Sequence, residues 1–317
     1  MAYTQTNSPS QVNTIALSVA MADELDKALM EGTVTGMLGD GDKLKAKFMG
    51  NGIVVIKDVD MQALGDYDRD TGFASGSVTI SHTPYQLTQD RARTFQIDSQ
   101  DADESGIGNL AGTVMKEFVR TKVVPESDAY TLSKIVGFAS TASHVTNISG
   151  SWPANTDLTK IATTINSVQQ AAGYDEDLVC FVDSGVFAGL QTTTELSRSL
   201  DVSDFKKGDI YTKVYSYNSV PIVPVPAARM KSAYDFYDGV TAGQTAGGFV
   251  PASGAKDVKI IVLPKKAVNV VRKHEKVRIF APDKNLTADA WKLDYRLYYD
   301  VLLKKSYANT IYAITNG

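Results

Sequence analysis

One segment of this chain is patterned as two strands that could not stay folded as an isolated unit. Between Lys47 and Asp98, apolar and polar residues alternate along an outgoing and a returning half, which is the pattern of β-strands. The apolar positions are Ile53, Val54, Ile56, Val59, Val78, Ile80, Tyr85, Leu87, Phe95 and Ile97. An isolated hairpin is marginally stable in water, and its open edges favour pairing with other strands. Halves that extend roughly 50 Å at about 3.3 Å per residue therefore need another surface, and a second copy of the chain is the preferred candidate.

The far end of this arm is acidic. Asp66, Asp68 and Asp70 have the spacing that opens a calcium loop, but the glycine falls one place late, at Gly72, and Ser77 occupies the position of the bidentate glutamate. A helix-loop-helix context is also missing. We therefore interpret the tip as a solvated or inter-subunit acidic turn, with a calcium-dependent binding module as the alternative.

Composition bounds the class of protein. The chain has 317 residues, a net charge of −4 and 43% hydrophobic residues, which is typical of one or two soluble globular domains. No apolar run approaches the roughly 20 residues of a membrane span, and the N-terminus lacks the order of a signal peptide. We expect that the protein is made in the cytoplasm and that it does not contact a membrane. The single cysteine, Cys180, lies in an apolar strand pattern that predicts a buried, inert thiol.

Helical periodicity surrounds the arm on both sides. Residues 1–14 are polar and aperiodic, and an apolar stripe over 15–29 predicts a helix. After Ser105, a plausible N-cap, a strongly amphipathic helix is predicted from Ile107 to Val119, and Pro125 fits the first turn of a second helix that extends to Ala139. These two helices together predict a spine for the fold.

The remainder of the chain predicts a mixed unit and then a strand-rich end. A helix stopped at Gly173, a strand around Cys180 and a short helix after Asp183 indicate a compact α/β unit. The proline-containing strand 220–226 is predicted to lie at a sheet edge, because proline cannot donate a ladder hydrogen bond. The strand patterns near the C-terminus, 291–303 and 307–314, are interpreted as a closing hairpin. The first of them has the alternation of a half-exposed strand, with Leu293, Tyr295, Leu297 and Tyr299 between Asp294, Arg296 and Tyr298.

Catalysis receives little support from the residues. His82, His144 and His274 stand beside no nucleophile in a recognisable motif, so we expect no catalytic residues, no cofactor and no metal. Gly106, Gly108 and Ala111 resemble a dinucleotide fingerprint, but the carboxylates of Asp101, Asp103 and Glu104 would repel a pyrophosphate there. These acids are better interpreted as helix-dipole partners or as ligands for basic residues of another subunit.

With these parts in order, the chain resembles the major capsid proteins of tailed phages, which have the HK97-like fold. The resemblance extends over nearly the whole chain and rests on the strings LGDYDRDTGF (64–73), LTQDR (87–91), EFVRTKVVPE (117–126) and PIVPVP (221–226). It implies an α+β fold with an N-terminal arm (1–30), an extended two-stranded loop (47–98) and an axial domain (155–255). The peripheral domain would comprise 31–46, 99–154 and 256–317, including a spine helix at 104–124.

The resemblance also implies a function. The chain would assemble through hexamers and pentamers into an icosahedral shell around double-stranded DNA, in a virion made in the bacterial host cytoplasm. Expected partners are separate scaffolding, portal and decoration proteins. Because the chain has too short an arm for a scaffold in cis, a separate scaffold or none is expected. The predicted inter-subunit contacts are Asp66, Asp68, Arg69, Asp70, Arg91 and Arg93 on the arm, with Glu117, Arg120 and Lys122 on the spine helix. An encapsulin-like compartment, which shares the fold but carries protein cargo, remains the main rival.

Overall fold

The computed structural model describes residues 29, 32–38, 47–48, 53–100, 110–153, 156–192, 201–207, 210–285 and 288–317. Apart from residue 29, the predicted helix of 15–29 and the predicted N-terminal arm, 1–30, lie outside these ranges. The same holds for the acidic residues 101–104, Ser105 and the Gly106 motif.

A seven-stranded sheet with the order β5-β15-β12-β6-β9-β8-β7 is the middle layer of the larger body. Its strands are β5 (Val145–Ile148), β6 (Leu178–Asp183), β7 (Asp201–Lys207), β8 (Ile210–Tyr217), β9 (Val220–Val225), β12 (Asp257–Pro264) and β15 (Tyr312–Asn316). Side chains of β6 alternate between two cores, because successive residues of a strand point to opposite faces. Cys180 and Val182 pack with α5 (Asp157–Ala172) and α6 (Ser184–Thr192), whereas Phe181 packs in the core that contains α4 (Val124–Thr141).

Several local predictions for this body are confirmed. Helix α5 ends at its C-cap Gly173, whose φ of 95° lies in a region of backbone conformation that favours glycine. Strand β6 is buried at every position, so the burial predicted for Cys180 is confirmed, and this burial raises the pKa of its thiol.

Two predictions about strand position are wrong. Strand β9 lies between β6 and β8 rather than at an edge. Two features of the pairing with β8 let β9 carry its prolines in this position. The antiparallel pairing ends at Ile222, so Pro224 has no partner in β8, and Pro221 is paired at only one position, with Ser216. Strand β15 does not close a hairpin with its predecessor, since it pairs with β12 and β5 instead. Strands β5, β12 and β15 come from outside 155–255, so that segment does not form its sheet alone.

One continuous helix connects this body to the rest of the molecule. It consists of α3 (Leu110–Phe118), the π-helical turn η3 (Val119–Val123) and α4. The two helices predicted on either side of Pro125 are therefore joined. A proline ring collides with the carbonyl group four residues earlier in an α-helix, and that residue, Thr121, lies within the π turn. The Val124 N–H bonds to the Val119 oxygen there, and this wider turn lets the helix pass the proline.

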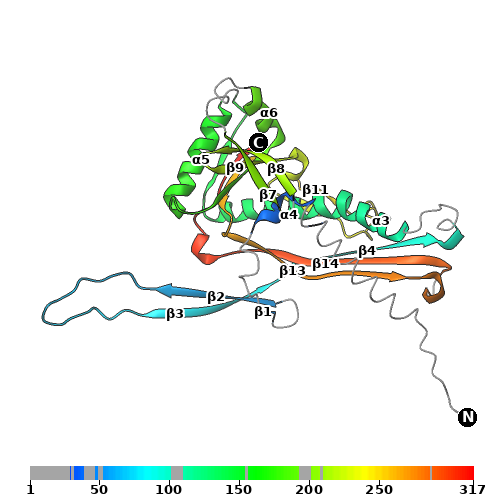
Figure 1. Cartoon of the computed structure of the whole chain (residues 1–317), viewed down its shortest axis with the longest axis horizontal. Coiled ribbons are helices and arrows are strands. Elements are labelled where there is room, and N and C mark those ends of the chain that lie inside the picture. Colours follow the sequence, from blue (N-terminus) through cyan, green and yellow to red (C-terminus); the bar gives the residue numbers. More distant parts are fainter. Residues whose placement is uncertain are drawn as a thin grey trace, which may run out of the picture.

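A long three-stranded sheet packs along this helix, with the order β13-β14-β4 (Figure 1). Its strands are β4 (Gln89–Asp98), β13 (Val268–Phe280) and β14 (Ala290–Leu303). The predicted alternation of β14 is confirmed, because Leu293, Tyr295, Leu297 and Tyr299 are all buried. The ring of Phe118 packs edge-on against Phe95 and Tyr295, at centroid distances of 4.8 and 5.7 Å. The helix is thus held between the two sheets.

The hairpin is formed by β2 (Ile53–Met61) and β3 (Val78–Gln86), and it projects from the body at one end of the long axis (Figure 1). The prediction that the two-stranded arm extends to Asp98 is wrong for its last part. Residues of β4 pair with β14 from Tyr299↔Gln89 to Ala290↔Asp98. Burial decides this, because Phe95 and Ile97 gain apolar contacts in the sheet that a projecting hairpin could not supply.

Shorter elements complete the described chain. They are η1 (Val34–Met37), β1 (Lys47–Phe48), η4 (Ala227–Arg229), β10 (Tyr234–Phe236), β11 (Phe249–Pro251), η5 (Pro282–Lys284) and η6 (Lys305–Tyr307). Buried Asp128 on α4 fixes η1, because its carboxylate accepts bonds from the Val34 and Thr35 N–H groups and from Arg229, each at 3.1 Å.

Candidate interaction surfaces

The hairpin exposes apolar side chains that the body does not cover. Among the described residues, eight large apolar side chains are strongly exposed, and six of them lie on the hairpin and its connecting loop. These are Met61, Leu64, Tyr67, Phe73, Val78 and Ile80. Apolar side chains scattered singly over a protein surface are normal, whereas exposed apolar side chains that cluster on one element mark an interaction surface. The hairpin is therefore the leading candidate for a contact with another molecule.

The tip of the hairpin has a defined conformation despite its exposure. The Asp68 carboxylate accepts hydrogen bonds from the N–H groups of Asp70 and Thr71, at 2.7 and 3.4 Å. Asp68 and Gly72 exchange two backbone bonds, and Gly72 has a φ of 86°. The rings of Tyr67 and Phe73 meet edge-on at 5.0 Å. Backbone hydrogen bonds hold the pKa of the Asp68 carboxyl below its ordinary value, so the tip is an ordered, ionised turn.

The predicted contacts Asp66, Arg69 and Asp70 all lie exposed on this tip. Asp68 is exposed too, but its carboxylate also stabilises the turn. Among the residues that the structure describes, no three His, Cys, Asp or Glu side chains come together as potential metal ligands.

The root of the hairpin is fixed to the sheet by a small core. Val54 and Leu87 pack with Val271 of β13 and Leu302 of β14, and all four are buried. The Tyr298 hydroxyl adds a hydrogen bond to the Leu87 oxygen at 3.1 Å. The direction in which the hairpin leaves the body is therefore set by packing.

Buried Asp300 of β14 holds the residue that follows this core. Its carboxylate accepts bonds from the Thr88 N–H at 3.0 Å, the Thr88 hydroxyl at 2.9 Å and the Tyr130 hydroxyl at 2.7 Å. Burial is the main cause of the raised pKa of Tyr130, so the phenol stays protonated and can donate to Asp300. This network was not predicted from the sequence, because its three residues are distant in sequence and no spacing motif connects them.

The predicted contacts Arg91 and Arg93 are used within the chain. Arg91 forms an ion pair with Glu126 of α4 at 2.6 Å and donates to the Tyr237 oxygen at 2.8 Å. Both terminal nitrogens of Arg93 lie 3.3 Å from the Thr245 oxygen. These side chains point to the helix side of the sheet and connect β4 to α4 and to the segment after β10. They do not lie with the hairpin tip.

The predicted contacts on the helix surface are also exposed. Glu117 and Arg120 form a two-bond ion pair at 2.7 and 3.0 Å, and these hydrogen bonds hold the pKa of Glu117 below its ordinary value. Lys122 lies exposed in the π turn. The charges of Glu117 and Arg120 therefore largely compensate one another.

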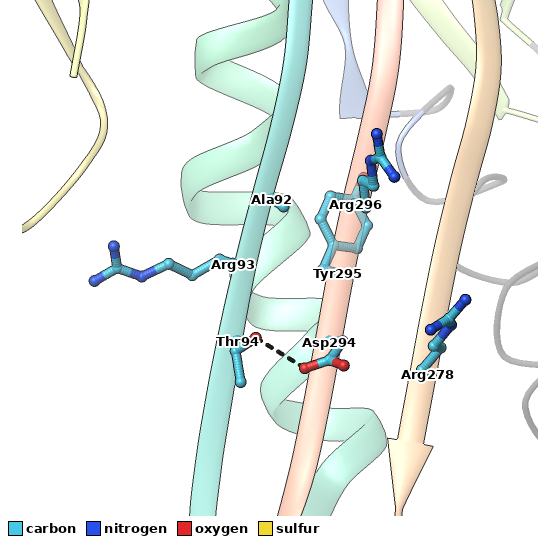
Figure 2. Close-up of a pocket in the computed structure, with 7 residues that line it drawn as sticks. All are labelled: Ala92, Arg93, Thr94, Arg278, Asp294, Tyr295 and Arg296. Carbon is cyan, nitrogen blue, oxygen red and sulfur yellow. Dashed lines mark hydrogen bonds between the residues drawn. The ribbon is translucent and has the colours of Figure 1, made fainter. Parts of the chain in front are cut away.

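The face of the β13-β14-β4 sheet opposite the helix carries a second group of charged residues. It contains a depression of about 310 Å³, lined by Ala92, Arg93, Thr94, Arg278, Asp294, Tyr295 and Arg296. Figure 2 shows Arg278 and Arg296 on one side of this group, while Arg93 extends the other way. Thr94 donates to Asp294 at 2.8 Å, and Arg296 binds Asp90 through two bonds. Strand alternation predicted an outward face for Asp294 and Arg296, but not which strands would lie beside them.

Among the residues that the structure describes, no helix has both the length and the apolar character that a membrane crossing requires.

The sequence matches no protein-family model and no curated protein. Solved structures with a similar fold nevertheless exist. The mature capsid of bacteriophage PhiM1 superimposes with a TM-score of 0.54 at 13% identity, covering 88% of this chain and 89% of that chain. The capsid of cyanophage P-SCSP1u gives 0.54 at 13% identity, covering 86% and 85%. A virus-like particle from Pyrococcus furiosus gives 0.52 at 8% identity, covering 94% and 99%. The chain therefore has the fold of phage capsid proteins, and the predicted HK97-like capsid fold is confirmed.

Proposed function

We propose that this protein is the major capsid protein of a tailed phage or prophage, and that it assembles through hexamers and pentamers into an icosahedral shell around double-stranded DNA. The observation that carries this proposal is the hairpin, an ordered element whose apolar side chains are left exposed by the part of the chain that the structure describes. Shell proteins need such an element, because the free energy of assembly comes from surface left exposed in the subunit. The shared fold supports the same conclusion.

The proposed mechanism divides the work between two kinds of contact. Burial of apolar hairpin side chains supplies most of the stability, at roughly 25 cal/mol per Å². Charges at the tip add about 0 to 1 kcal/mol per exposed pair, so they set the register of neighbours rather than the strength of the shell. Many weak contacts in a closed shell act together through multivalency. No step requires catalysis or a cofactor.

In this proposal the segment 1–30 is the N-terminal arm and the axial domain is centred on 155–255. The extended loop is the β2–β3 hairpin. It is shorter than the predicted 47–98, because β4 pairs with β14 in the three-stranded sheet. Portal, scaffolding and decoration proteins are the proposed partners besides the DNA.

Electron microscopy and sedimentation of the purified protein test this proposal. We expect closed icosahedral particles at high protein concentration, and smaller species on dilution. A protein that remains monomeric across concentration, salt and temperature would refute the proposal.

An encapsulin-like compartment is the second candidate, favoured by the similarity to the Pyrococcus furiosus virus-like particle. The two functions differ in what the shell contains. Particles isolated from the native producing cells should hold nuclease-protected double-stranded DNA if the protein is a phage capsid. Nucleic-acid-free particles that hold a specific protein would favour the compartment.

A further inference from the structure

We propose that the acidic turn 174–177 of one subunit docks on the loop 238–248 of a second copy of this chain, with Tyr174 against Val240 and Asp175 against Arg93. This inference rests on the proposed function, because a shell places copies of the chain side by side. The contact is lateral and does not involve the hairpin. It gives Arg93 a role between subunits in addition to its bond within the chain.

Two apolar side chains outside the hairpin are left strongly exposed by the described part of the chain. Tyr174 is 72% exposed and Val240 is 82% exposed. Tyr174 follows the C-cap Gly173 of α5, and Val240 lies in the loop between β10 and β11. Single exposed apolar side chains are normal on a protein surface, so the surroundings of these two decide whether they form a contact.

The loop between β10 and β11 is ordered before any partner is present. Its ends meet where the Tyr237 N–H donates to the Gly248 oxygen at 2.9 Å. The Asp238 carboxylate accepts bonds from the N–H groups of Val240 and Thr241, at 2.8 and 2.9 Å. A bond from the Thr241 hydroxyl, together with these two, lowers the pKa of Asp238 to about 2. Compact loops with closed ends are frequently functional, and a preorganised loop loses little conformational entropy on binding.

A positive charge lies beside this loop. Both terminal nitrogens of Arg93 lie 3.3 Å from the Thr245 oxygen, which is a neutral acceptor. In the described part of the chain no carboxylate forms an ion pair with Arg93, whereas Arg91 is paired with Glu126 at 2.6 Å. Figure 2 shows the Arg93 side chain extending away from the other arginines of the sheet. A Cβ added at Gly239, the neighbour of Val240, would lie 3.0 Å from Arg93 Nη1, so this cation is at the edge of the loop.

The acidic turn is held in a fixed position and carries free carboxylates. The Tyr307 hydroxyl donates to Glu176 at 2.9 Å, and the Lys265 N–H donates to the Asp177 oxygen at 2.8 Å. Asp175 and Asp177 are exposed, and among the residues that the structure describes neither carboxylate has a hydrogen bond or an ion pair. The turn therefore offers negative charge that nothing in the described chain compensates.

The two surfaces match in chemistry. Each combines one exposed apolar side chain with one uncompensated charge, which is Asp175 beside Tyr174 and Arg93 beside Val240. Apolar burial stabilises such a contact, and opposite charge steers the encounter and rejects wrong registers. A contact that seats Tyr174 on Val240 can also supply Arg93 with a carboxylate.

The partner is a second copy, because the two surfaces lie on opposite sides of one subunit. Figure 1 shows α5 on the side of the larger body from which the hairpin projects, and β11, which directly follows the loop, on the side of α3. One chain therefore cannot join its own turn to its own loop. Turn and loop are different surfaces, so each subunit uses both, and a repeated contact of this kind closes into a ring.

Thiol cross-linking of a double-cysteine variant tests the docking directly. Cys180 is fully buried, so introduced cysteines are the reactive thiols of the folded protein. A chain that carries both Tyr174→Cys and Val240→Cys, treated with a short bis-maleimide, should give a ladder of covalent oligomers, while each single variant stays monomeric on a denaturing gel. Thr159→Cys with Val240→Cys is the control and should give no ladder. Thr159 is exposed on α5, but at 1.5 Å per residue it lies roughly 20 Å from the C-terminal end of the helix.

A double-mutant cycle supplies the second measurement. Tyr174→Ala and Val240→Ala should each raise the protein concentration needed for assembly by about tenfold. The double variant should need no more protein than either single variant, because the contact is already lost. Thr159→Ala with Val240→Ala is the matched control and should behave as Val240→Ala alone. Asp175→Arg should also weaken assembly, whereas Asp175→Glu, which keeps the charge, should not.

The outcomes separate this inference from the proposed function. Particles that form without the ladder, and in which the effects of Tyr174→Ala and Val240→Ala simply add, would overturn the docking and leave the shell intact. A ladder of oligomers without closed particles would support the docking and refute the shell. If neither particles nor a ladder form, both proposals fail.

Discussion

Two aspartates fix the geometry of the hairpin, one at each end. Asp68 orders the tip through the N–H groups of Asp70 and Thr71, and Asp300 holds Thr88 at the root. An ionised carboxylate accepts hydrogen bonds through both oxygens and donates none, which suits two sites that present only N–H and O–H donors. Their roles can be tested separately.

The pKa of Asp68 reports the order of the tip. The hydrogen bonds lower it below 3.8, so the ionised form stabilises the folded turn. That stabilisation is present above the unfolded pKa and is lost as the pH falls through the folded pKa. NMR titration of ¹³C-labelled aspartate carboxyls in unassembled subunits should show Asp68 titrating below the ordinary range. Titration at or above that range would mean that the turn does not form in solution.

Replacement of Asp300 should destabilise the subunit. In Asp300→Asn, the amide NH₂ group is itself a donor and would face N–H or O–H groups that donate to the carboxylate of Asp300. We therefore expect a loss of about 2 kcal/mol in the free energy of unfolding. Urea denaturation of unassembled subunits measures this value. Asp175→Asn at an exposed site should change it by less than about 0.5 kcal/mol. Equal effects of the two substitutions would contradict the role of the network.

At the scale of elements, the hairpin has a buried root and an exposed outer part. Leu87, which directly follows β3, is 3% exposed, whereas Ile80 within β3 is 53% exposed. The root core therefore acts in the subunit, and the outer residues act only when a neighbour covers them. One truncation at each position should separate folding from assembly.

Leu87→Ala should lower the free energy of unfolding by about 3 kcal/mol, because it leaves a cavity in the root core. Ile80→Ala should change that free energy by less than about 0.5 kcal/mol yet raise the concentration needed for assembly. Urea denaturation and sedimentation measure the two quantities. If Ile80→Ala left assembly unchanged, the apolar face of the hairpin would have no part in the shell.

Local patterns predicted most elements but not their partners. Alternation identified β14 correctly, and Gly173 marked the end of α5. The same alternation assigned β4 to the hairpin, because a strand's period does not tell which strand it pairs with. Pro125 similarly indicated the start of a helix, but the helix continues past this proline. The π turn that allows this is revealed only by the folded chain.

The candidate site divides in the same way. Asp66, Arg69 and Asp70 were predicted from an exposed turn and do lie on one. Arg91 and Arg93 belong to the same sequence region, but pairing with β14 turns them toward α4 and the Thr245 segment. Arg278 was missed because its exposure depends on the position of β13 in the sheet.

For the whole molecule, the position of charges on the tip should matter more than their number. Exchanging Arg69 and Asp70, in the variant Arg69→Asp with Asp70→Arg, keeps the composition and net charge of the tip. We expect failed or misshapen assembly, because the carboxylate no longer faces its partner. Electron microscopy compares this variant with wild type. Normal particles from the exchanged protein would show that the tip does not select register.

The central claim is that the hairpin completes its packing only on another copy of the chain. A cryo-electron microscopy reconstruction of the assembled protein measures this most directly. We predict a closed icosahedral shell in which residues 61–80 of each subunit lie against a neighbouring subunit and their apolar side chains are buried. A shell in which those side chains remain exposed to solvent, or a protein that forms no shell, would contradict it.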